Sequence, residues 1–259
     1  MRHAKSFFVS FFEWFGELGL FCGRLLKSAF VPPFEGRELL SQMDEIGSRS
    51  LPLVALAGAA TGVVLSLQVS DSLVRFGGKA LLPEVIVFSL IKETGPMITA
   101  LVVAGRVGAG IGAELGSMRV TEQIDAMEAS AVDPYKFLAA TRVLACVTML
   151  PLLTLAANFC GIMMGWVATT LVEPTSLRLF LHNGFQNVGS DDFLPPLAKT
   201  AVYGLIIGLV ASFQGMRSRG GTAGVGRSAT SSVVLSSLFI ILADVVMVKL
   251  ILVLFPYES

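Results

Sequence analysis

Apolar residues are grouped in five long runs, and shorter polar segments separate these runs. The runs cover about residues 51–69, 83–112, 137–172, 196–216 and 231–255. Each is close to or above the ~20 residues that an α-helix needs to cross the hydrocarbon core of a bilayer, so each predicts one membrane-spanning helix. The sequence "KETGP" interrupts the second run, and the third is long enough that it must tilt, kink at Pro151 or project into water.

The first 50 residues follow a different pattern. Five apolar residues recur at helical spacing among charged ones: Phe8, Phe11, Phe12, Phe15 and Leu18. This pattern predicts an amphipathic helix that lies in the membrane interface, and the polar segment 31–50 predicts a linker with a second short helix. We therefore expect N-terminal interfacial and cytoplasmic helices in residues 1–50 and a five-helix membrane domain in residues 51–259.

Small residues recur every four positions within the apolar runs. Gly58, Gly62 and Ser66 form such a row in the first run, and Gly204 and Gly208 form another in the fourth. Small residues at this spacing let membrane helices approach closely, because no hydrophobic force drives helices together inside a bilayer. We interpret these rows as packing surfaces between helices.

The composition supports the same class of protein. Hydrophobic residues make up 54% of the chain and charged residues only 15%, whereas a soluble domain has about 25% charged residues. The sequence thus predicts an all-α integral membrane protein. The formal net charge is zero, so charge gives no reason to expect a nucleic-acid partner.

Arginine and lysine are unevenly distributed between the two sides of the membrane. Thirteen lie in the N-terminal region, between the second and third helices, or between the fourth and fifth, and four lie on the opposite side. This count places Arg142 in the larger group and Lys199 in the smaller one. By the positive-inside rule the N-terminus is cytoplasmic. Five crossings then put the C-terminus and a loop at about residues 173–195 on the outer side.

A charged segment follows the second membrane helix, at about residues 114–131. Val120, Ile124, Met127 and Ala131 share one face of the predicted helix, which should end before Pro134. The segment either connects two membrane helices along the membrane surface or docks into a soluble partner. Surface-lying helices usually carry Lys and Arg, whereas this helix carries four acids: Glu114, Glu122, Asp125 and Glu128. The acidic face favours docking.

Charged residues also occur inside the apolar runs. Lys92 and Glu93 lie in the second run just before Pro96, and Asp244 lies in the fifth. A charge at the bilayer centre costs roughly 2.5–3.5 kcal/mol, so these residues are either functional or paired for packing. Neighbouring side chains on an α-helix diverge by about 100°, so we expect one of Lys92 and Glu93 to face a cavity and the other a neighbouring helix. Asp244 is a candidate partner for Lys92.

The segment "SLIKETGPMITALVVAGRVGAGIGAELGSMRVTEQIDAMEASAVDPYKFLAATRVLA" and the later "MRSRGGTAGVGRSATSSVV" resemble the MlaE/YrbE-type permeases of MCE-associated ABC lipid transporters. These systems maintain the lipid asymmetry of the outer membrane. The E-x-x-D-A element, Glu122 to Ala126, is specific to that family. The resemblance covers the chain from about residue 51 to its end.

The resemblance implies several partners. The 114–131 segment would be the coupling helix that sits in a groove of a cytoplasmic P-loop ATPase, with contacts from Glu114, Arg119, Glu122, Asp125 and Met127. Two copies of the chain would form a homodimer in the inner membrane. A periplasmic single-span MCE protein, hexameric in assembly, and a small STAS-type cytoplasmic subunit would complete the transporter. This chain would then carry phospholipid without being an enzyme.

ATP hydrolysis is expected in the partner. The nearest match to a phosphate-binding loop, "GRLLKS", is too short for GxxxxGK[ST], so we expect no cofactor in this chain, and ATP with magnesium in the ATPase. We predict neither catalytic nor metal-binding residues. His3 and His182 lack metal-ligand spacing, and Cys22, Cys146 and Cys160 are best explained as small buried hydrophobic residues.

A lipid cavity between two protomers requires apolar walls and a few polar groups for the head group. Leu65, Val69, Leu73 and Phe76 follow one another down one face at the end of the first run, with Gln68 nearby. We predict the walls there and the polar groups at Lys92 and Glu93. The alternative is an ion-coupled secondary transporter in which Glu93 and Asp244 bind a proton or cation, although such transporters often contain an inverted repeat and this sequence shows none.

Overall fold

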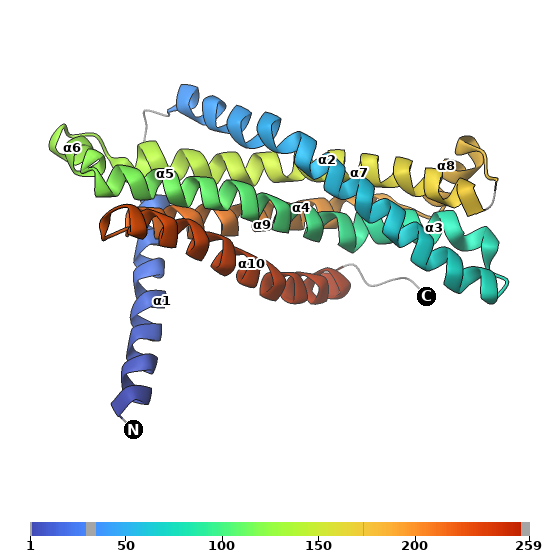
Figure 1. Ribbon diagram of the computed structural model, residues 1–259, viewed down its shortest axis with the longest axis horizontal. Coiled ribbons are helices and arrows are strands. Elements are labelled where there is room, and N and C mark those ends of the chain that lie inside the picture. The colour runs from blue at the N-terminus through green and yellow to red at the C-terminus, as the bar shows by residue number, and fades with distance from the viewer. Residues whose placement is uncertain (1, 30–34, 173, 255–259) are drawn as a thin grey trace.

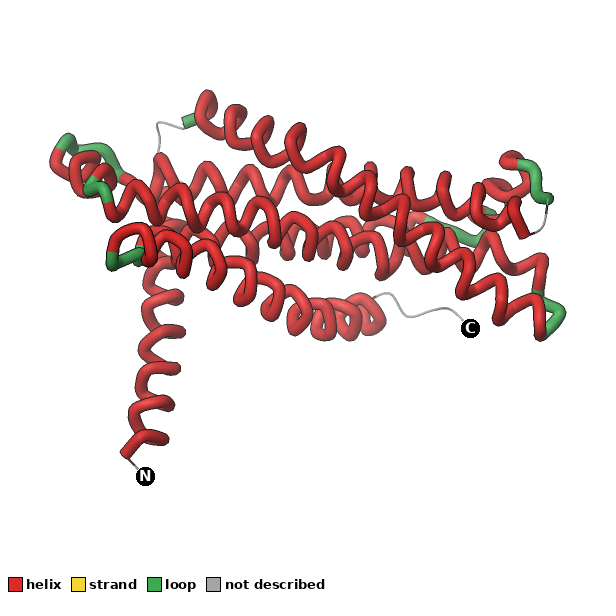
Figure 2. Tube along the Cα trace, in the orientation of Figure 1, coloured by secondary structure: helices red, strands yellow, loops and turns green. Residues whose placement is uncertain are grey.

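The computed structural model describes residues 2–29, 35–172 and 174–254, and every regular element within them is helical. The helices form an elongated bundle with its loops at the two ends (Figures 1 and 2). Four long helices contribute one membrane crossing each: α2 (Gly36–Arg75), α7 (Thr141–Val172), α9 (Ser190–Met216) and α10 (Gly221–Leu254). The remaining crossing is a continuous stack of shorter segments.

That stack begins after a single 3₁₀ turn, η1 (Lys79–Leu81). Its segments are α3 (Leu82–Ser89), the π-helical turn η2 (Leu90–Thr94), α4 (Gly95–Val103), a second π-helical turn η3 (Ala104–Gly108) and α5 (Ala109–Val120). The predicted interruption at "KETGP" is therefore the π-helical turn that precedes Pro96. Because proline has no N–H and its ring clashes with the preceding turn, an α-helix cannot continue unchanged there.

Five helical stretches are long and apolar enough to cross a membrane: residues 36–73, 79–120, 135–171, 191–216 and 221–251. This confirms the predicted all-α membrane protein with five spanning helices. Each stretch is longer than its apolar run, because polar residues at the ends continue the helices. The third includes the π-helical turn η4 (Tyr135–Ala140) and continues through Pro151 without a break.

The largest such extension corrects part of the expectation for residues 31–50. Residues 31–34 lie outside the described residues, and in place of a separate short helix, α2 begins at Gly36 and runs unbroken into the membrane helix. Side chains four residues apart stabilise its polar turns, because such pairs are neighbours on a helix surface. Gln42 Nε2 donates to Glu38 Oε1 at 2.9 Å, and Arg49 Nη1 lies 2.6 Å from Glu45 Oε1.

The amphipathic N-terminal segment forms α1 (Arg2–Ala29), which crosses the bundle near α6 (Gln123–Ala129) and projects away from it (Figure 1). Its C-terminal half packs on η4 and α9 through Phe21, whose ring lies 5.6 Å from those of Tyr135 and Phe213. Phe12 is exposed, whereas the side chains of Phe8 and Phe11 lie outside the described part of the structure. That α1 lies in the membrane interface remains a prediction.

The rows of small residues pack helices together, as predicted. A Cβ added at Gly58 would lie 2.3 Å from the carbonyl oxygen of Ala157, and one at Gly62 would lie 2.0 Å from that of Gly161, so α2 and α7 meet backbone to backbone. Gly204 of α9 similarly faces the backbone of Cys146. Close approach of this kind replaces hydrophobic association as the main stabilising interaction within a bilayer.

The segment at residues 173–195, predicted as an outer loop, contains the short helix α8 (Leu177–Phe185) and the first turns of α9. It lies at the end of the bundle opposite α6 (Figure 1). Residue 173 and the C-terminal tail 255–259, which we predict to be on the outer side, are outside the described residues.

Candidate functional site

The turn η2 directs both of its charged side chains toward α9. Lys92 Nζ lies 3.1 Å from Oδ1 of Asp192, in the first turn of α9, and 4.5 Å from the centre of the Phe88 ring. Glu93 Oε2 lies 2.7 Å from Nζ of Lys199. The proposed pairing of Lys92 with Asp244 is therefore wrong.

Both charged groups contact α9, so the expectation that only one of Lys92 and Glu93 would face a neighbouring helix is wrong. Which of the two faces a cavity stays a prediction. Asp192 and Lys199 are seven residues apart, about two turns, so they lie on the same face of α9. A π-helical turn contains more residues per turn than an α-helix, so successive side chains diverge by less than 100°. Lys92 contacts Asp192 in the first turn of α9, and Glu93 contacts Lys199 two turns further along the same helix.

Lys199 is the centre of a buried ionic cluster. Its side chain is 0% exposed, and Nζ lies 2.7 Å from Glu93 Oε2 and 2.9 Å from Asp244 Oδ1. Tyr203, one turn further along α9, donates a hydrogen bond to the same Asp244 oxygen. Three helical segments far apart in sequence thus meet through one ammonium group. We refer to Glu93, Lys199, Tyr203 and Asp244 as the ionic cluster.

The positive-inside count treated Lys199 as a loop residue on the outer side. The structure instead encloses its side chain within the bundle, on α9. The positive-inside count treats every basic residue near the end of an apolar run as a loop residue. Arg142 was also counted as a loop residue, but it lies in α7 with its side chain only 2% exposed and its Nη2 2.7 Å from Glu114 Oε1; the side assigned to it is not contradicted. The sequence did contain one indication that Lys199 is buried: Tyr203, a polar residue four positions later, lies on the same face of the apolar helix.

The ionic cluster is open on one side. The Glu93 side chain is 45% exposed, that of Asp244 is 15% exposed, and Lys199 is enclosed. Two carboxylates share one ammonium, so the cluster carries a net charge of −1 with its exposed carboxylate at Glu93. Such a site can bind a cationic or hydrogen-bond-donating group that approaches from the Glu93 side.

The same geometry argues against the ion-coupled alternative. In that mechanism Glu93 and Asp244 would bind a proton or cation, but the Lys199 ammonium already lies between the two carboxylates. Within the described residues, no group of three or more His, Cys, Asp or Glu side chains is placed to hold a metal ion.

The predicted wall residues of a lipid cavity do not all lie on an open surface. Leu65 and Val69 are partly buried against an apolar cluster that includes Ile86 and Leu90. Leu73 is half-buried beside Gly78, whereas Gln68 and Phe76 are exposed. In a single chain, Gln68 and Phe76 therefore present the most surface to a ligand among these five residues.

The predicted helix 114–131 is two helices separated by a sharp turn. Helix α5 ends at Val120, Glu122 adopts a left-handed conformation with φ +60°, and α6 begins at Gln123. The Thr121 hydroxyl donates to the Ser117 carbonyl oxygen at 2.8 Å, which satisfies an acceptor at the end of α5. The prediction of a single continuous helix over residues 114–131 is therefore wrong.

The C-terminal end of α6 also differs from the prediction. The helix ends at Ala129, and the Val132 N–H donates to the Met127 carbonyl oxygen at 3.0 Å. Ala131 has φ +61° and lies beyond the helix rather than on its apolar face. This arrangement is a Schellman-type C-terminal cap, in which a left-handed residue lets a later N–H reach back into the last turn.

Helix α6 turns its apolar residues inward and its acids outward. Ile124 is buried, and Met127 packs against the main core cluster. Asp125 forms an ion pair with Arg119 at the end of α5, while Glu122 and Glu128 are exposed. Glu114 points toward α7 through its contact with Arg142. Of the five predicted coupling residues, Glu122 and Asp125 therefore present acidic groups on the outer side of α6.

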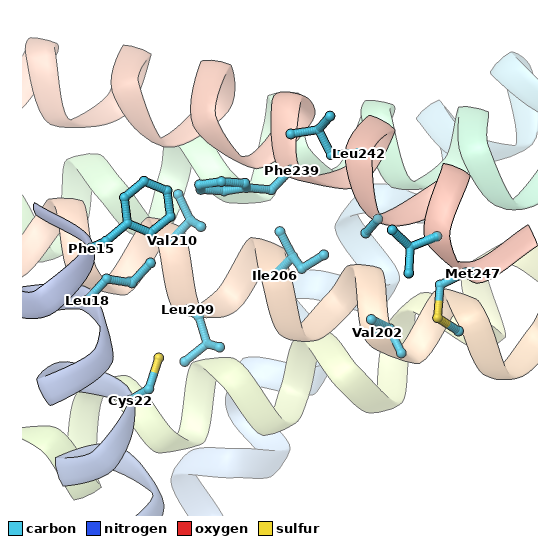
Figure 3. Close-up of a pocket in the computed structure, with 12 residues that line it drawn as sticks. Phe15, Leu18, Cys22, Val202, Ile206, Leu209, Val210, Phe239, Leu242 and Met247 are labelled. Atoms are coloured by element: carbon cyan, nitrogen blue, oxygen red, sulfur yellow. The ribbon is translucent and has the colours of Figure 1, made fainter. Parts of the chain in front are cut away.

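An apolar pocket of about 520 Å³ lies between α1, α9 and α10 (Figure 3). Phe15, Leu18 and Cys22 line it from α1, and Ile206 and Phe239 face it from α9 and α10. No lining residue is charged. The pocket can therefore hold hydrocarbon but offers no group for a charged ligand, which distinguishes it from the ionic cluster.

The family described as Permease MlaE matches residues 39–250. Similar proteins include a probable ABC transporter permease of Rickettsia conorii, 36% identical over 242 residues that cover 93% of both chains. Another, from Synechocystis, is 36% identical over 208 residues, 80% of this chain and 79% of the relative. The chloroplast protein trigalactosyldiacylglycerol 1 of Arabidopsis thaliana is 30% identical over 235 residues, 90% of this chain and 67% of that protein. The chain belongs to the MlaE permease family and is a transmembrane permease subunit of the ABC transporter class.

Proposed function

We propose that this permease moves phospholipid, or a related lipid, between the inner membrane and a periplasmic MCE protein, driven by a separate ATPase. The observation that carries this proposal is the ionic cluster within an otherwise apolar bundle, with Glu93 exposed beside enclosed Lys199. A polar head group needs such a site at membrane depth, whereas acyl chains need only the apolar surfaces around it. The name of the Arabidopsis relative, which contains a galactolipid, supports a lipid substrate.

We expect two cytoplasmic partners, and the α5–α6 end of the bundle is suited to one of them. The acidic outer side of α6, with Glu122 and Asp125, is suited to a groove in a P-loop ATPase, which would supply ATP and magnesium. The relatives described as ABC transporter permeases support an ATPase partner. A small STAS-type cytoplasmic subunit would bind elsewhere in the complex. On the periplasmic side, the α8 end would face a hexameric single-span MCE protein.

A homodimer would complete the cavity. Helix α10 leaves large apolar side chains exposed along much of its length, including Val234, Leu238, Ile241 and Val245. A second copy of the chain could cover part of this surface, and the exposed side chains of Glu93, Gln68 and Phe76 would then line an enclosed space. The apolar walls of that space would come from both protomers.

Photo-crosslinking tests the lipid function directly. A photoreactive residue at Gln68 or Phe76 should capture phospholipid in membranes, as identified by mass spectrometry. Glu93→Lys should reduce this capture about tenfold, because a charge-assisted hydrogen bond to the head group contributes about 1.5 kcal/mol or more. The matched control is a photoreactive residue at the exposed Leu205 of α9, where lipid capture should not depend on Glu93.

Two results would count against this function. Equal capture at Phe76 and Leu205, unaffected by Glu93→Lys, would mean that the probe reports bulk lipid only. Lipid transport that persists in vesicles without any ATPase would support the secondary-transporter alternative instead. In that case the Glu93 variant should lose its dependence on a proton or sodium gradient.

Topology can be tested by labelling single cysteines with an impermeant thiol reagent. In a chain without native cysteines, a cysteine at Gln186 or after Ser259 should react in intact cells, whereas Arg219→Cys should react only after lysis. The expected pattern follows from the positive-inside rule, which survives the reassignment of Arg142 and Lys199. Burial raises the pKa of the Cys22 thiol. In the chain that keeps its native cysteines, Cys22 should therefore react slowly with the reagent. The reverse pattern would invert the proposed orientation.

A further inference from the structure

The residue that follows the turn η2 is contacted by a polar side chain of α7. A Cβ added at Gly95, the first residue after the turn, would lie 1.7 Å from Oδ1 of Asn158 and 2.6 Å from the carbonyl oxygen of Leu90. Both distances are shorter than real Cβ contacts. The Asn158 amide therefore occupies the notch that the missing side chain of Gly95 leaves beside the turn.

Asn158 lowers the stability of the folded protein at this position. It is 6% exposed, and its Oδ1 atom accepts no hydrogen bond. A buried amide without a partner costs about 1–3 kcal/mol, and leucine would fill the same volume without that cost. The amide nitrogen and oxygen can exchange places by rotation about the side chain. In the exchanged orientation Nδ2 would occupy this notch, whose Cβ position is 2.6 Å from the Leu90 carbonyl oxygen.

The Leu90 carbonyl is the acceptor that closes the turn. It accepts the Gly95 N–H, and the next residue, Pro96, has no N–H to continue the pattern. A carbonyl oxygen has two lone pairs, so Leu90 can accept the Asn158 amide as well as Gly95.

We propose that Asn158 is a positioning residue for the head-group site. Its amide donates to the Leu90 carbonyl oxygen and holds η2 in its π-helical form, which places Glu93 against Lys199 and Lys92 against Asp192. The consequence for transport rests on the proposed lipid function. The contact between Asn158 of α7 and the notch at Gly95 is independent of that function.

The test combines Asn158→Leu with Glu93→Gln in the complete complex, reconstituted in phosphatidylethanolamine and phosphatidylglycerol. Lipid capture by a photoreactive residue at Phe76 is measured per assembled protein. Asn158→Leu should lower capture about tenfold, the upper range for one hydrogen bond. Asn158→Leu added to Glu93→Gln should lower it no further, because residues that act through one another are not additive. Asn158→Ala, which removes the amide without filling the notch, should behave like Asn158→Leu.

The matched control is Thr154→Val, one turn earlier on α7. Thr154 is equally buried, and its hydroxyl donates to Leu150 of its own helix. This variant should change capture less than twofold. Unchanged capture in Asn158→Leu, or additive losses of about a hundredfold in the double variant, would overturn the positioning role. If Glu93→Gln alone has no effect on capture, the proposed lipid site fails instead.

Discussion

Replacing Lys199 by methionine is expected to abolish transport and to destabilise the protein more than any other single change in the membrane domain. Lys199 is fully enclosed, and its ammonium is 2.7 Å from Glu93 and 2.9 Å from Asp244. Without it, two carboxylates remain close together in an apolar bundle. Breaking a buried ion pair by removing one partner costs about 3–5 kcal/mol. The loss should appear as a lower thermal midpoint in detergent and as a lower yield of assembled complex.

The neutral variant of the same cluster separates folding from function. Lys199→Met combined with Glu93→Gln and Asp244→Asn removes all three charges, and such replacements are often close to neutral in stability. We expect this triple variant to recover the thermal midpoint but not lipid transport. Recovery of both would show that the charges serve packing alone. Lys199→Arg, which keeps the positive charge, is the control for side-chain replacement at this position.

The five membrane helices were predictable because hydrocarbon thickness sets a length that the sequence must match. The packing role of Gly58 and Gly62 was predictable for a similar reason, since small residues four positions apart let another backbone approach closely. Both features follow from local sequence. That α7 is the helix which approaches Gly58 and Gly62 was not predicted.

The ionic cluster could not be predicted in the same way. Glu93, Lys199 and Asp244 come from three separate helical segments, and only the packed bundle brings them together. The hydropathy pattern placed Lys199 near the end of a run, where a basic residue usually reaches water. The turn at Glu122 was missed for a different reason. A left-handed conformation is uncommon for glutamate, and a helical pattern that continues on both sides conceals the break.

The second large effect is expected at α6. Glu122→Lys combined with Asp125→Lys should reduce copurification of the ATPase at least tenfold, while the permease still inserts and dimerises. Both acids lie on the outer side of α6, and α6 is anchored to the core by Ile124. Charge reversal at a docking surface replaces attraction by repulsion, which costs several kcal/mol at an interface, and each 1.4 kcal/mol changes affinity tenfold.

Single variants and a control define what the coupling result means. Asp125 also binds Arg119, so Asp125→Lys alters the connection between α5 and α6 as well as the docking surface. Glu122→Gly removes an exposed side chain with its carboxylate and suits the left-handed backbone, so it should weaken ATPase binding without lowering the thermal midpoint. Glu45→Lys reverses one charge, as Asp125→Lys does, at an exposed position on α2 and should leave binding intact. If all the α6 variants retain full ATPase binding and full transport, α6 is a connector between membrane helices and the ATPase docks elsewhere on the cytoplasmic face.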